Sequence, residues 1–164
     1  MWSMVNADPL ETRRLRLVPK TLADVRAQID AMDAGQRAEL SPAWLAQLNS
    51  TRVDLWTLGF DILDRGTDAV VGTCGFKGPP GADGVVEIAY GVTPDQQGKG
   101  YATEAAEALV AYAFGGKHVR LVRAHTLAAT NASTRVLTKC RFRFAGEVDD
   151  PDDGLVWRWE RQPD

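Results

Sequence analysis

Two glycines and a lysine precede an alanine-rich segment in the run Gln97-Gly98-Lys99-Gly100-Tyr101-Ala102-Thr103. Glycines before a helix leave backbone N–H groups uncovered and let another molecule approach the main chain closely. Because the first turn of a helix also carries a partial positive charge, the run suits an anionic group such as a phosphate. A tight strand-to-helix turn without a ligand is the alternative, since a lone G-x-G is a weak signal.

The spacing of this run differs from that of two familiar phosphate-binding motifs. It lacks the G-x-x-x-x-G-K-[ST] pattern of a P-loop, and Thr103 stands where the dinucleotide pattern G-x-G-x-x-G needs its third glycine. Lys99 either adds positive charge to a bound phosphate or remains in solvent. The residues therefore favour a phosphate site that belongs to neither class.

A strand and a helix must flank the glycine run if it is to hold a ligand. Residues Val85–Val92 are rich in β-branched residues and predict a strand, which a turn at Pro94 follows. After the glycines, apolar residues recur at helical spacing up to a stop at Gly115 and Gly116. The recurring residues are Ala102, Ala105, Ala106, Leu109, Ala113 and Phe114. This pattern predicts a helix packed against a sheet.

The N-terminal part of the chain predicts one strand and two helices. Residues 13–19 alternate polar and apolar side chains, as a half-buried strand does. Thr21 is a suitable cap for a first helix that Gly35 ends, and Ser41 caps a second helix that starts with Pro42. Both helices are expected to cover the sheet.

The rest of the chain predicts a hairpin, a surface loop and alternating strands and helices. Turn residues at 65–68 join two β-rich runs, and the loop at 79–84 is dense in proline and glycine. The strands predicted after residue 50 are 55–64, 69–78, 85–92, 119–127, 142–148 and 155–161, with a helix over 131–139. The predicted order is β, α, α, three β, α, β, α, β, β.

Composition and charge indicate an ordinary globular protein. The chain has 164 residues, of which 45% are hydrophobic and 25% charged, and this predicts one domain over residues 1–164. A net charge of −3 argues against a nucleic-acid binder. Arg13, Arg14 and Arg16 alternate with leucines, so we expect the solvated face of a strand there rather than a phosphate grip.

Cysteine and histidine spacing and the apolar runs exclude further classes. Cys74 and Cys140 show no C-x-x-C spacing, and neither histidine has a partner at metal-ligand spacing, so we expect no metal. No apolar run approaches the roughly 18 residues that cross a bilayer, so no membrane is expected as a partner. Without an apolar leader pattern, the sequence predicts a reduced, cytoplasmic protein.

The glycine run and its surroundings resemble the GCN5-related N-acetyltransferases (GNAT), in particular the branch of ribosomal-protein-alanine N-acetyltransferases. Gln97 to Ala102 matches the family's pyrophosphate motif, Gln or Arg, x, x, Gly, x, Gly or Ala. "ETRRLRLVP" is similar to the branch's opening strand and "EIAYGVTPDQQGKGYATEA" to its central block. "NASTRVLTKCRFRFAGE" is similar to the helix and strand that close the site. The resemblance covers nearly the whole chain in the right order.

This resemblance implies a fold and a cosubstrate. The fold is α/β (α+β), the GNAT fold, with a central mixed, mostly antiparallel twisted sheet of about seven strands and about four helices on its faces. Acetyl-CoA would lie in a V-shaped splay between the fourth and fifth strands, with its pantetheine arm paired like an added strand and its pyrophosphate on backbone amides. The implied cofactor-binding residues are Tyr90, Gly91, Val92, Gln97, Gly98, Lys99, Gly100, Tyr101, Ala102, Thr103 and Asn131.

The resemblance also implies catalytic groups. Glu87, on the strand beside the thioester, matches the glutamate that the family often uses as a base, directly or through water; the alternative is a carboxylate on a solvated strand face. Ser133 would protonate or hydrogen-bond the leaving sulfur, and Asn131 would approach the pantetheine, but both residue types are also common helix caps. His125, near the end of a strand, is a weaker candidate.

One position departs from the family's pattern. Arg141 stands where the branch usually has glycine, in the run Lys139-Cys140-Arg141-Phe142. If this residue adopts a left-handed backbone, it costs about 1 kcal/mol relative to glycine. The departure concerns local stability and the acceptor pocket rather than the CoA site.

Two functions from different classes are consistent with these residues. The first is an acetyl-CoA-dependent N-acetyltransferase, which moves acetyl directly to a primary amine in a ternary complex; the acceptor is a peptide N-terminal α-amine or a small-molecule amine. The second is a non-catalytic CoA-binding sensor or interaction module. The sequence carries no readable code for the acceptor, and a homodimer through an edge strand with Trp157 and Trp159 stays open.

Overall fold

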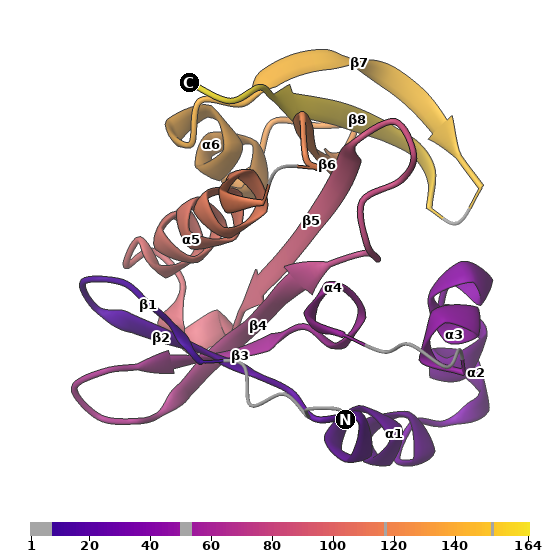
Figure 1. Ribbon diagram of the computed structural model, residues 1–164, viewed down its shortest axis with the longest axis vertical. Helices are drawn as coiled ribbons and strands as arrows, with labels where there is room; N and C mark the ends of the chain where they lie inside the picture. The colour runs from indigo at the N-terminus through magenta and orange to yellow at the C-terminus, as the bar shows by residue number, and fades with distance from the viewer. Residues whose placement is uncertain (1–7, 50–53, 117, 152) are drawn as a thin grey trace.

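An eight-stranded sheet forms the centre of the computed structural model, which describes residues 8–49, 54–116, 118–151 and 153–164 (Figure 1). The strands are β1 (Leu10–Glu11), β2 (Leu15–Pro19), β3 (Phe60–Asp64), β4 (Val70–Phe76), β5 (Val85–Val92), β6 (Leu121–Leu127), β7 (Arg143–Asp150) and β8 (Gly154–Arg161). Their order across the sheet is β1-β2-β3-β4-β5-β6-β8-β7. All neighbours are antiparallel except β5 and β6, which are parallel. This confirms the expected mixed, mostly antiparallel sheet, with β1 as an additional short strand.

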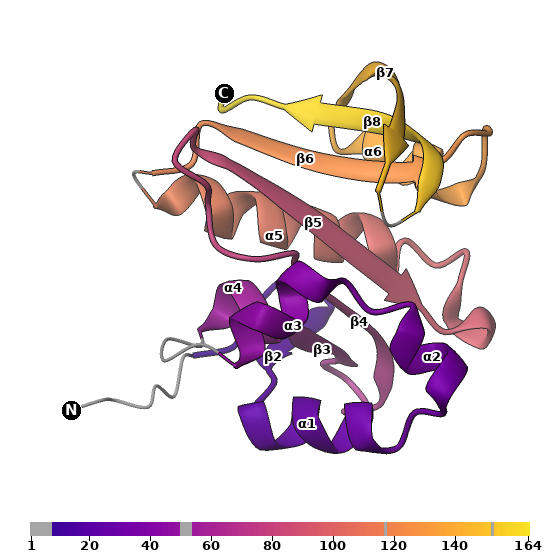
Figure 2. The same ribbon diagram turned by 90° about the vertical axis from the view of Figure 1, so that its right-hand side faces the viewer.

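Helices cover both faces of this sheet. The described residues form α1 (Leu22–Asp30), α2 (Ala34–Ala38), α3 (Pro42–Leu48), α4 (Leu55–Leu58), the 3₁₀ helix η1 (Pro94–Gln96), α5 (Tyr101–Gly115) and α6 (Ala132–Lys139). Seen in two views, α5 and α6 lie on one face, and α1 to α4 lie toward the other (Figures 1 and 2). No helix within the described ranges is long and apolar enough to cross a membrane.

The expected strand over residues 55–64 was wrong in its first half, because residues 55–58 form α4. The Asp54 carboxylate accepts the N–H of Trp56 at 3.1 Å, and the Asp54 carbonyl accepts the next two backbone N–H groups. Side-chain capping thus starts a helical turn inside an apolar run. The turn stops at Gly59, and β3 follows from Phe60.

Predictions for the first 50 residues were partly confirmed. Thr21 and Ser41 cap α1 and α3 as expected. Gly35, in contrast, does not end a helix, because Asp33 and Gln36 form a reciprocal capping box that starts α2 over this glycine. The expected strand over residues 13–19 begins only at Leu15, and this shift places Arg14 in the turn before β2.

The expectation of a tryptophan-rich edge strand was also wrong. Trp157 and Trp159 lie on β8, which is paired with β6 on one side and β7 on the other. The strand at this edge of the sheet is therefore β7. Phe144 of β7 stacks edge-on with Trp157 and Trp159, at centroid distances of 5.3 and 5.6 Å, so the tryptophans belong to an intramolecular aromatic cluster.

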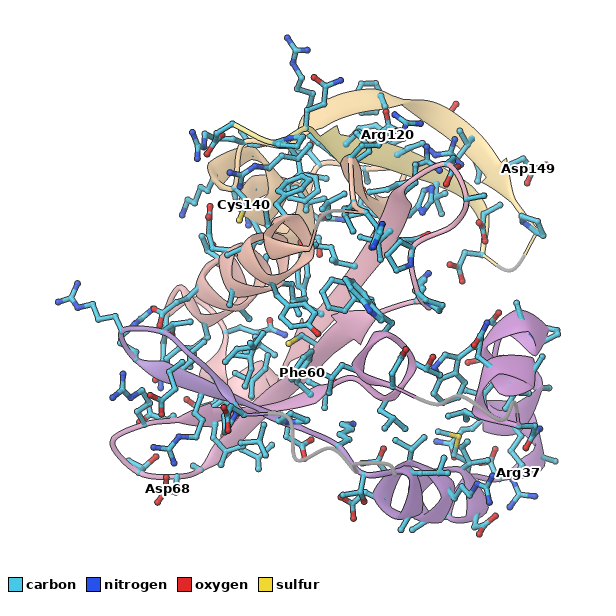
Figure 3. The ribbon with its side chains drawn as sticks, viewed as in Figure 1. Arg37, Phe60, Asp68, Arg120, Cys140 and Asp149 are labelled. Carbon is cyan, nitrogen blue, oxygen red and sulfur yellow. The ribbon has the colours of Figure 1, made fainter. Side chains whose placement is uncertain are left out.

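The main core lies between the sheet and α5. Ala105, Leu109 and Ala113 of α5 are fully buried against strand residues such as Leu17 and Phe60. Figure 3 shows Phe60 among the side chains below α5. Small alanines at the contact bring the helix close to the strands, and α5 packs against β5, β2 and β4.

Arg141 adopts the left-handed backbone that its position in the sequence suggested, with φ of 64°. It follows the last turn of α6, where its N–H donates to the Thr138 carbonyl at 3.0 Å and the Phe142 N–H to the Leu137 carbonyl at 2.9 Å. This pair of bonds is the Schellman motif, which favours glycine at the position of Arg141.

We expect the substitution Arg141→Gly to raise the free energy of unfolding by about 1 kcal/mol, because glycine carries no Cβ penalty at positive φ. Urea denaturation measures the difference. The control is Arg141→Ala, which also removes the exposed 3.2 Å ion pair with Asp164 but keeps the Cβ. Equal stabilities of the glycine and alanine variants would show that backbone strain is not the cause.

Candidate functional site

The glycine run forms a loop in front of α5, and within the described part of the chain the backbone N–H groups of residues 98–102 have no hydrogen-bond acceptor. Gly98 and Gly100 have φ of 80° and 85°, which residues with a Cβ rarely adopt. Gly100 occupies the N-cap position of α5 and provides no side-chain acceptor for the first-turn N–H groups. Because those donors need partners and the helix start carries partial positive charge, the loop is built to receive an anion.

A groove of about 340 Å³ opens beside this loop, between the end of β5, the start of α5 and α6. It brings together most of the residues that the sequence predicted for a cofactor. They are Tyr90, Gly91, Val92, Gln97, Gly98, Gly100, Tyr101, Ala102 and Thr103, together with Ser133. Residues more than 40 positions apart in the chain thus share one concave surface.

Three predicted residues do not line the groove. Lys99 is absent from the lining, and its ammonium donates to the Gln96 side chain at 2.9 Å. The Asn131 side chain caps α6 and accepts the Thr134 N–H at 3.0 Å, which is the alternative role considered for it. Glu87 lies on β5 three residues before Tyr90, outside the groove, and belongs to a separate polar network.

The groove also contains residues that the sequence reasoning missed. Arg135 and Lys139 of α6 line it, one helical turn apart. Their i, i+4 spacing on a predicted helix was the signal that could have placed both on one face. With Ala132 and Val136, also of α6, they line the groove on the side of that helix, and Gln96 lines it directly before the glycine run. Two cationic side chains facing a phosphate-shaped loop favour an anionic ligand.

Arg14 contacts the glycine loop and α5, whereas the sequence predicted that it would lie on the solvated face of a strand. Its guanidinium donates to the Lys99 carbonyl at 2.8 Å and lies 4.9 Å from the centre of the Tyr101 ring. Glu104, in the first turn of α5, accepts from the Arg14 Nε at 2.9 Å and from the Arg14 backbone at 2.8 Å. The Thr12 hydroxyl donates to the same carboxylate. This clamp ties the turn before β2 to the start of α5.

The clamp predicts a pH-dependent contribution to stability. Burial of Glu104 raises its pKa, but the hydrogen bonds from Thr12 and Arg14 and the guanidinium charge outweigh burial, so the pKa lies below its ordinary value. A lowered pKa in the folded state stabilises the fold above the unfolded-state value of about 4.3, and this contribution is lost as the pH falls through the folded-state pKa.

We therefore expect Glu104→Gln to lower the free energy of unfolding by about 1 kcal/mol at pH 7, because a charge-assisted set of hydrogen bonds becomes neutral. Urea denaturation at pH 7 and at pH 3 measures the effect. The gap between wild type and variant should narrow at the lower pH. A gap of the same size at both pH values would contradict the assigned role of the carboxylate.

The parallel strands β5 and β6 separate at Glu87. Their paired residues are Val85 with Leu121, Val86 with Val122 and Glu87 with Arg123, and the pairing ends there. Beyond this point β5 pairs with β4 alone and β6 with β8. The facing edge of residues 88–92 therefore has no strand partner within the described part of the chain, which leaves backbone groups for an extended ligand. This is the expected splay between the fourth and fifth predicted strands.

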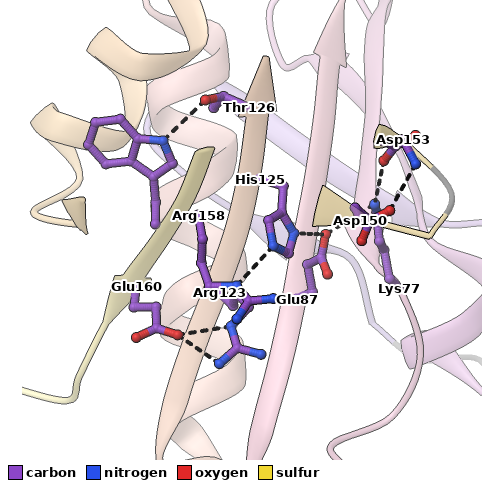
Figure 4. A network of polar contacts seen from close by, with 10 residues as sticks. Lys77, Glu87, Arg123, His125, Thr126, Asp150, Asp153, Arg158 and Glu160 are labelled. Atoms are coloured by element: carbon purple, nitrogen blue, oxygen red, sulfur yellow. Dashed lines mark hydrogen bonds and ion pairs between the residues drawn. The ribbon is translucent and has the colours of Figure 1, made fainter. Parts of the chain in front are cut away.

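Glu87 stands at the fork and is held by two partners (Figure 4). The Lys77 ammonium lies 3.0 Å from its Oε2, and His125 Nδ1 lies 2.9 Å from the same oxygen. On the other side of the ring, the Arg158 Nε donates to His125 Nε2 at 3.1 Å. Because arginine is only a donor, His125 carries its proton on Nδ1 and donates it to Glu87. The structure thus gives His125, a minor candidate in the sequence, a defined place next to Glu87.

Ser133 and Tyr90 meet at the far wall of the groove. The Tyr90 hydroxyl donates to the Ser133 carbonyl at 3.4 Å. Burial raises the pKa of Tyr90 to about 12, which outweighs the opposite effect of that hydrogen bond. Tyr90 is therefore protonated at neutral pH and acts as a hydrogen-bond donor. Ser133 lies in the first turn of α6 and lines the groove.

Neither cysteine has the environment of a nucleophile. Burial raises the pKa of both Cys74 and Cys140 to about 12, so both stay as thiols. Figure 3 shows Cys140 near α6 and α5, and its Sγ contacts the Thr103 carbonyl at 3.6 Å. Among the described residues, no three or more His, Cys, Asp or Glu side chains gather in a way that could hold a metal ion.

Comparison with known proteins gives concordant matches. A family model described as an acetyltransferase (GNAT) domain matches residues 3–143. An uncharacterized N-acetyltransferase, p20 of Bacillus licheniformis, is 26% identical over 144 residues, which cover 88% of this chain and 72% of that protein. Among solved structures, a putative ribosomal-protein-serine acetyltransferase from Vibrio cholerae has a TM-score of 0.70 at 17% identity, covering 98% of this chain and 100% of that one. RimL, a ribosomal L7/L12 alpha-N-protein acetyltransferase in complex with coenzyme A, has a TM-score of 0.66 at 15% identity, covering 94% and 98%.

Proposed function

Because the chain belongs to the GNAT family of acetyltransferases, we propose that it transfers an acetyl group from acetyl-CoA to a primary amine. The observation that carries this proposal is the groove beside the glycine loop. Gly98 and Gly100, both with positive φ, line this groove together with the cationic residues Arg135 and Lys139, so backbone donors and positive charges surround one space for an anion. The similar structure of RimL was solved with coenzyme A, which is consistent with a CoA ligand in such a fold. The acceptor we propose is a peptide α-amine or a small-molecule amine, and the transfer is direct.

The proposed binding mode uses the backbone amides of the glycine loop and the edge of β5 that pairs with no strand of the described residues. The pyrophosphate sits on the amides of residues 97–102, with the hydroxyl of Thr103 nearby. The pantetheine arm runs along the unpaired edge of β5 at residues 90–92 and extends toward the fork at Glu87. Arg135 and Lys139 add positive charge beside the phosphates.

The proposed chemistry uses Glu87 as the base and Ser133 as a hydrogen-bond donor to the sulfur. A protonated acceptor amine loses its proton to the Glu87 carboxylate, directly or through water, and attacks the thioester carbonyl. The departing thiolate is stabilised by the Ser133 hydroxyl, an effect that we expect to be modest because serine is a weak acid. His125 keeps the Glu87 carboxylate in place.

The experiment that tests this function measures thiol release from acetyl-CoA with a panel of acceptors. The panel holds peptides with free N-termini, polyamines, aminoglycosides and small amines, and the acetylated product is identified by its mass. Release that depends on one acceptor class supports the transferase. Binding of acetyl-CoA without release on any acceptor would favour the alternative, a CoA-binding sensor.

A further inference from the structure

Lys77 places a primary amine beside the candidate base. It follows directly after β4, and its backbone N–H donates to the Glu87 carbonyl at 2.9 Å, so the two residues are neighbours across the β4–β5 ladder. Its Nζ lies 3.0 Å from Glu87 Oε2 (Figure 4). The backbone hydrogen bond and the ion pair together fix where this amine lies.

This amine also lies where the splay between β5 and β6 begins. Glu87 is the last residue of β5 that pairs with β6. From Val92, near the glycine loop, to Glu87 the strand covers five residues, or about 17 Å at the rise of an antiparallel strand. An acetyl-CoA that extends along this edge therefore carries its thioester toward the Lys77 amine.

The charges around Lys77 keep its side chain protonated, as an ammonium. Burial lowers its pKa, but the carboxylates of Glu87, Asp153 and Asp150 outweigh burial and the pKa is raised. Asp153 Oδ2 lies 3.8 Å from the Nζ, and His125 and Arg158 lie on the far side of Glu87. The amine thus needs a base, and the carboxylate at 3.0 Å is one. The side chain is 48% exposed, so it has room to turn toward the splay.

From this geometry we infer that the protein acetylates its own Lys77, an inference that rests on the proposed function. The ammonium gives one proton to Glu87, and the freed Nζ attacks the thioester carbonyl. A C–N bond forms, the C–S bond breaks, and the CoA thiolate leaves and takes up the proton held by Glu87, which restores the carboxylate. The second proton leaves the nitrogen for solvent, so an ammonium and a thioester become an acetamide, a thiol and one H⁺.

Self-acetylation of Lys77 stops after one acetyl group per chain. The product is neutral, so it no longer forms the ion pair with Glu87. Its acetyl group then occupies space beside the base that an external acceptor would use. We therefore expect amine acceptors to compete with the reaction and to slow it.

The test is incubation of the wild-type chain with acetyl-CoA alone, followed by intact mass measurement and peptide mapping. Lys20, Lys99, Lys117 and Lys139 serve as internal controls for uncatalysed acetylation. We expect one added acetyl group, on Lys77, formed at least about tenfold faster than on any other lysine because the amine is held near the thioester. The fraction of chains acetylated per unit time should be independent of protein concentration. Glu87→Gln and denaturation should each abolish the preference for Lys77.

The outcomes separate this inference from the proposed function. If acetyl-CoA binds but Lys77 is acetylated no faster than the other lysines, the inference is overturned and the transferase proposal stands. If isothermal titration shows no binding of acetyl-CoA, both are overturned. A first-order rate constant, measured as the fraction of chains acetylated per unit time, that rises with protein concentration would also overturn the inference, because one chain would then be modifying another.

Discussion

The substitution Glu87→Gln is expected to lower kcat for amine acetylation at pH 7 by about 100-fold or more, because a positioned general base contributes roughly 10²–10⁴ in rate. Gln keeps the size of the side chain and an oxygen that accepts from His125 Nδ1, but it cannot take a proton. The affinity for CoA should stay nearly the same, since Glu87 does not line the groove. Steady-state kinetics and calorimetric titration with CoA measure the two quantities.

Glu160→Gln is the matched control for this experiment. Glu160 lies on β8 and forms a 2.7 Å ion pair with Arg123, which is paired with Glu87 in the last β5–β6 pair before the splay. Its side chain is 28% exposed, against 22% for Glu87, so the same change is made in a similar environment. We expect kcat of this variant to stay close to wild type. A Glu87→Gln enzyme with unchanged kcat would remove Glu87 as the base.

The second large effect is expected at Gly98. Gly98→Val should weaken CoA binding by roughly 5- to 30-fold, because a left-handed backbone costs a residue with a Cβ about 1–2 kcal/mol and a β-branched residue tolerates it poorly. No atom lies within 4 Å of a Cβ built at Gly98, so the change acts on the loop conformation rather than on packing. Calorimetric titration with CoA measures the dissociation constant.

Gly98→Asn separates the backbone effect from the effect of adding a side chain. Asn adopts positive φ more readily than other non-glycine residues, so it keeps the loop amides in place while adding a Cβ. The Asn variant should bind CoA several times more tightly than the Val variant. Equal affinities of the two variants would mean that the φ of 80° at Gly98 is not what presents the amides.

The parts of the site that follow from local sequence were predictable. The glycine run, the strand before it and the helix after it depend on residue types over about 30 neighbouring positions, and all three elements formed where expected. The order of elements after α5, which is β6, α6, β7 and β8, followed from the same periodicities, whereas β1, α2 and α4 were not predicted. The cost of Arg141 was also predictable, because the resembling family has glycine at this helix end and a left-handed backbone there disfavours a residue with a Cβ.

The parts that depend on distant residues were not predictable from periodicity. Arg14 reaches Lys99 across 85 positions, and its place depends on β2 starting at Leu15, two residues later than the alternation suggested. The ion pair of Lys77 with Glu87 depends on the register between β4 and β5. His125 meets Glu87 because β5 and β6 are parallel and in contact only up to the fork.

The helix α4 shows a different limit. Its residues are Leu, Trp, Thr and Leu, and the run of mostly apolar residues that they begin favoured a strand. One carboxylate, that of Asp54, outweighs this preference by capping the turn. Local propensity differs by less than about 1 kcal/mol per residue, which is comparable to a single cap.

The most direct test of the central claim is a crystal structure of the chain with coenzyme A bound. We expect diphosphate oxygens within hydrogen-bond distance of the backbone amides of residues 97–102 and the thiol between β5 and β6 beside Glu87. A coenzyme bound elsewhere, with the first turn of α5 facing only solvent, would contradict the account.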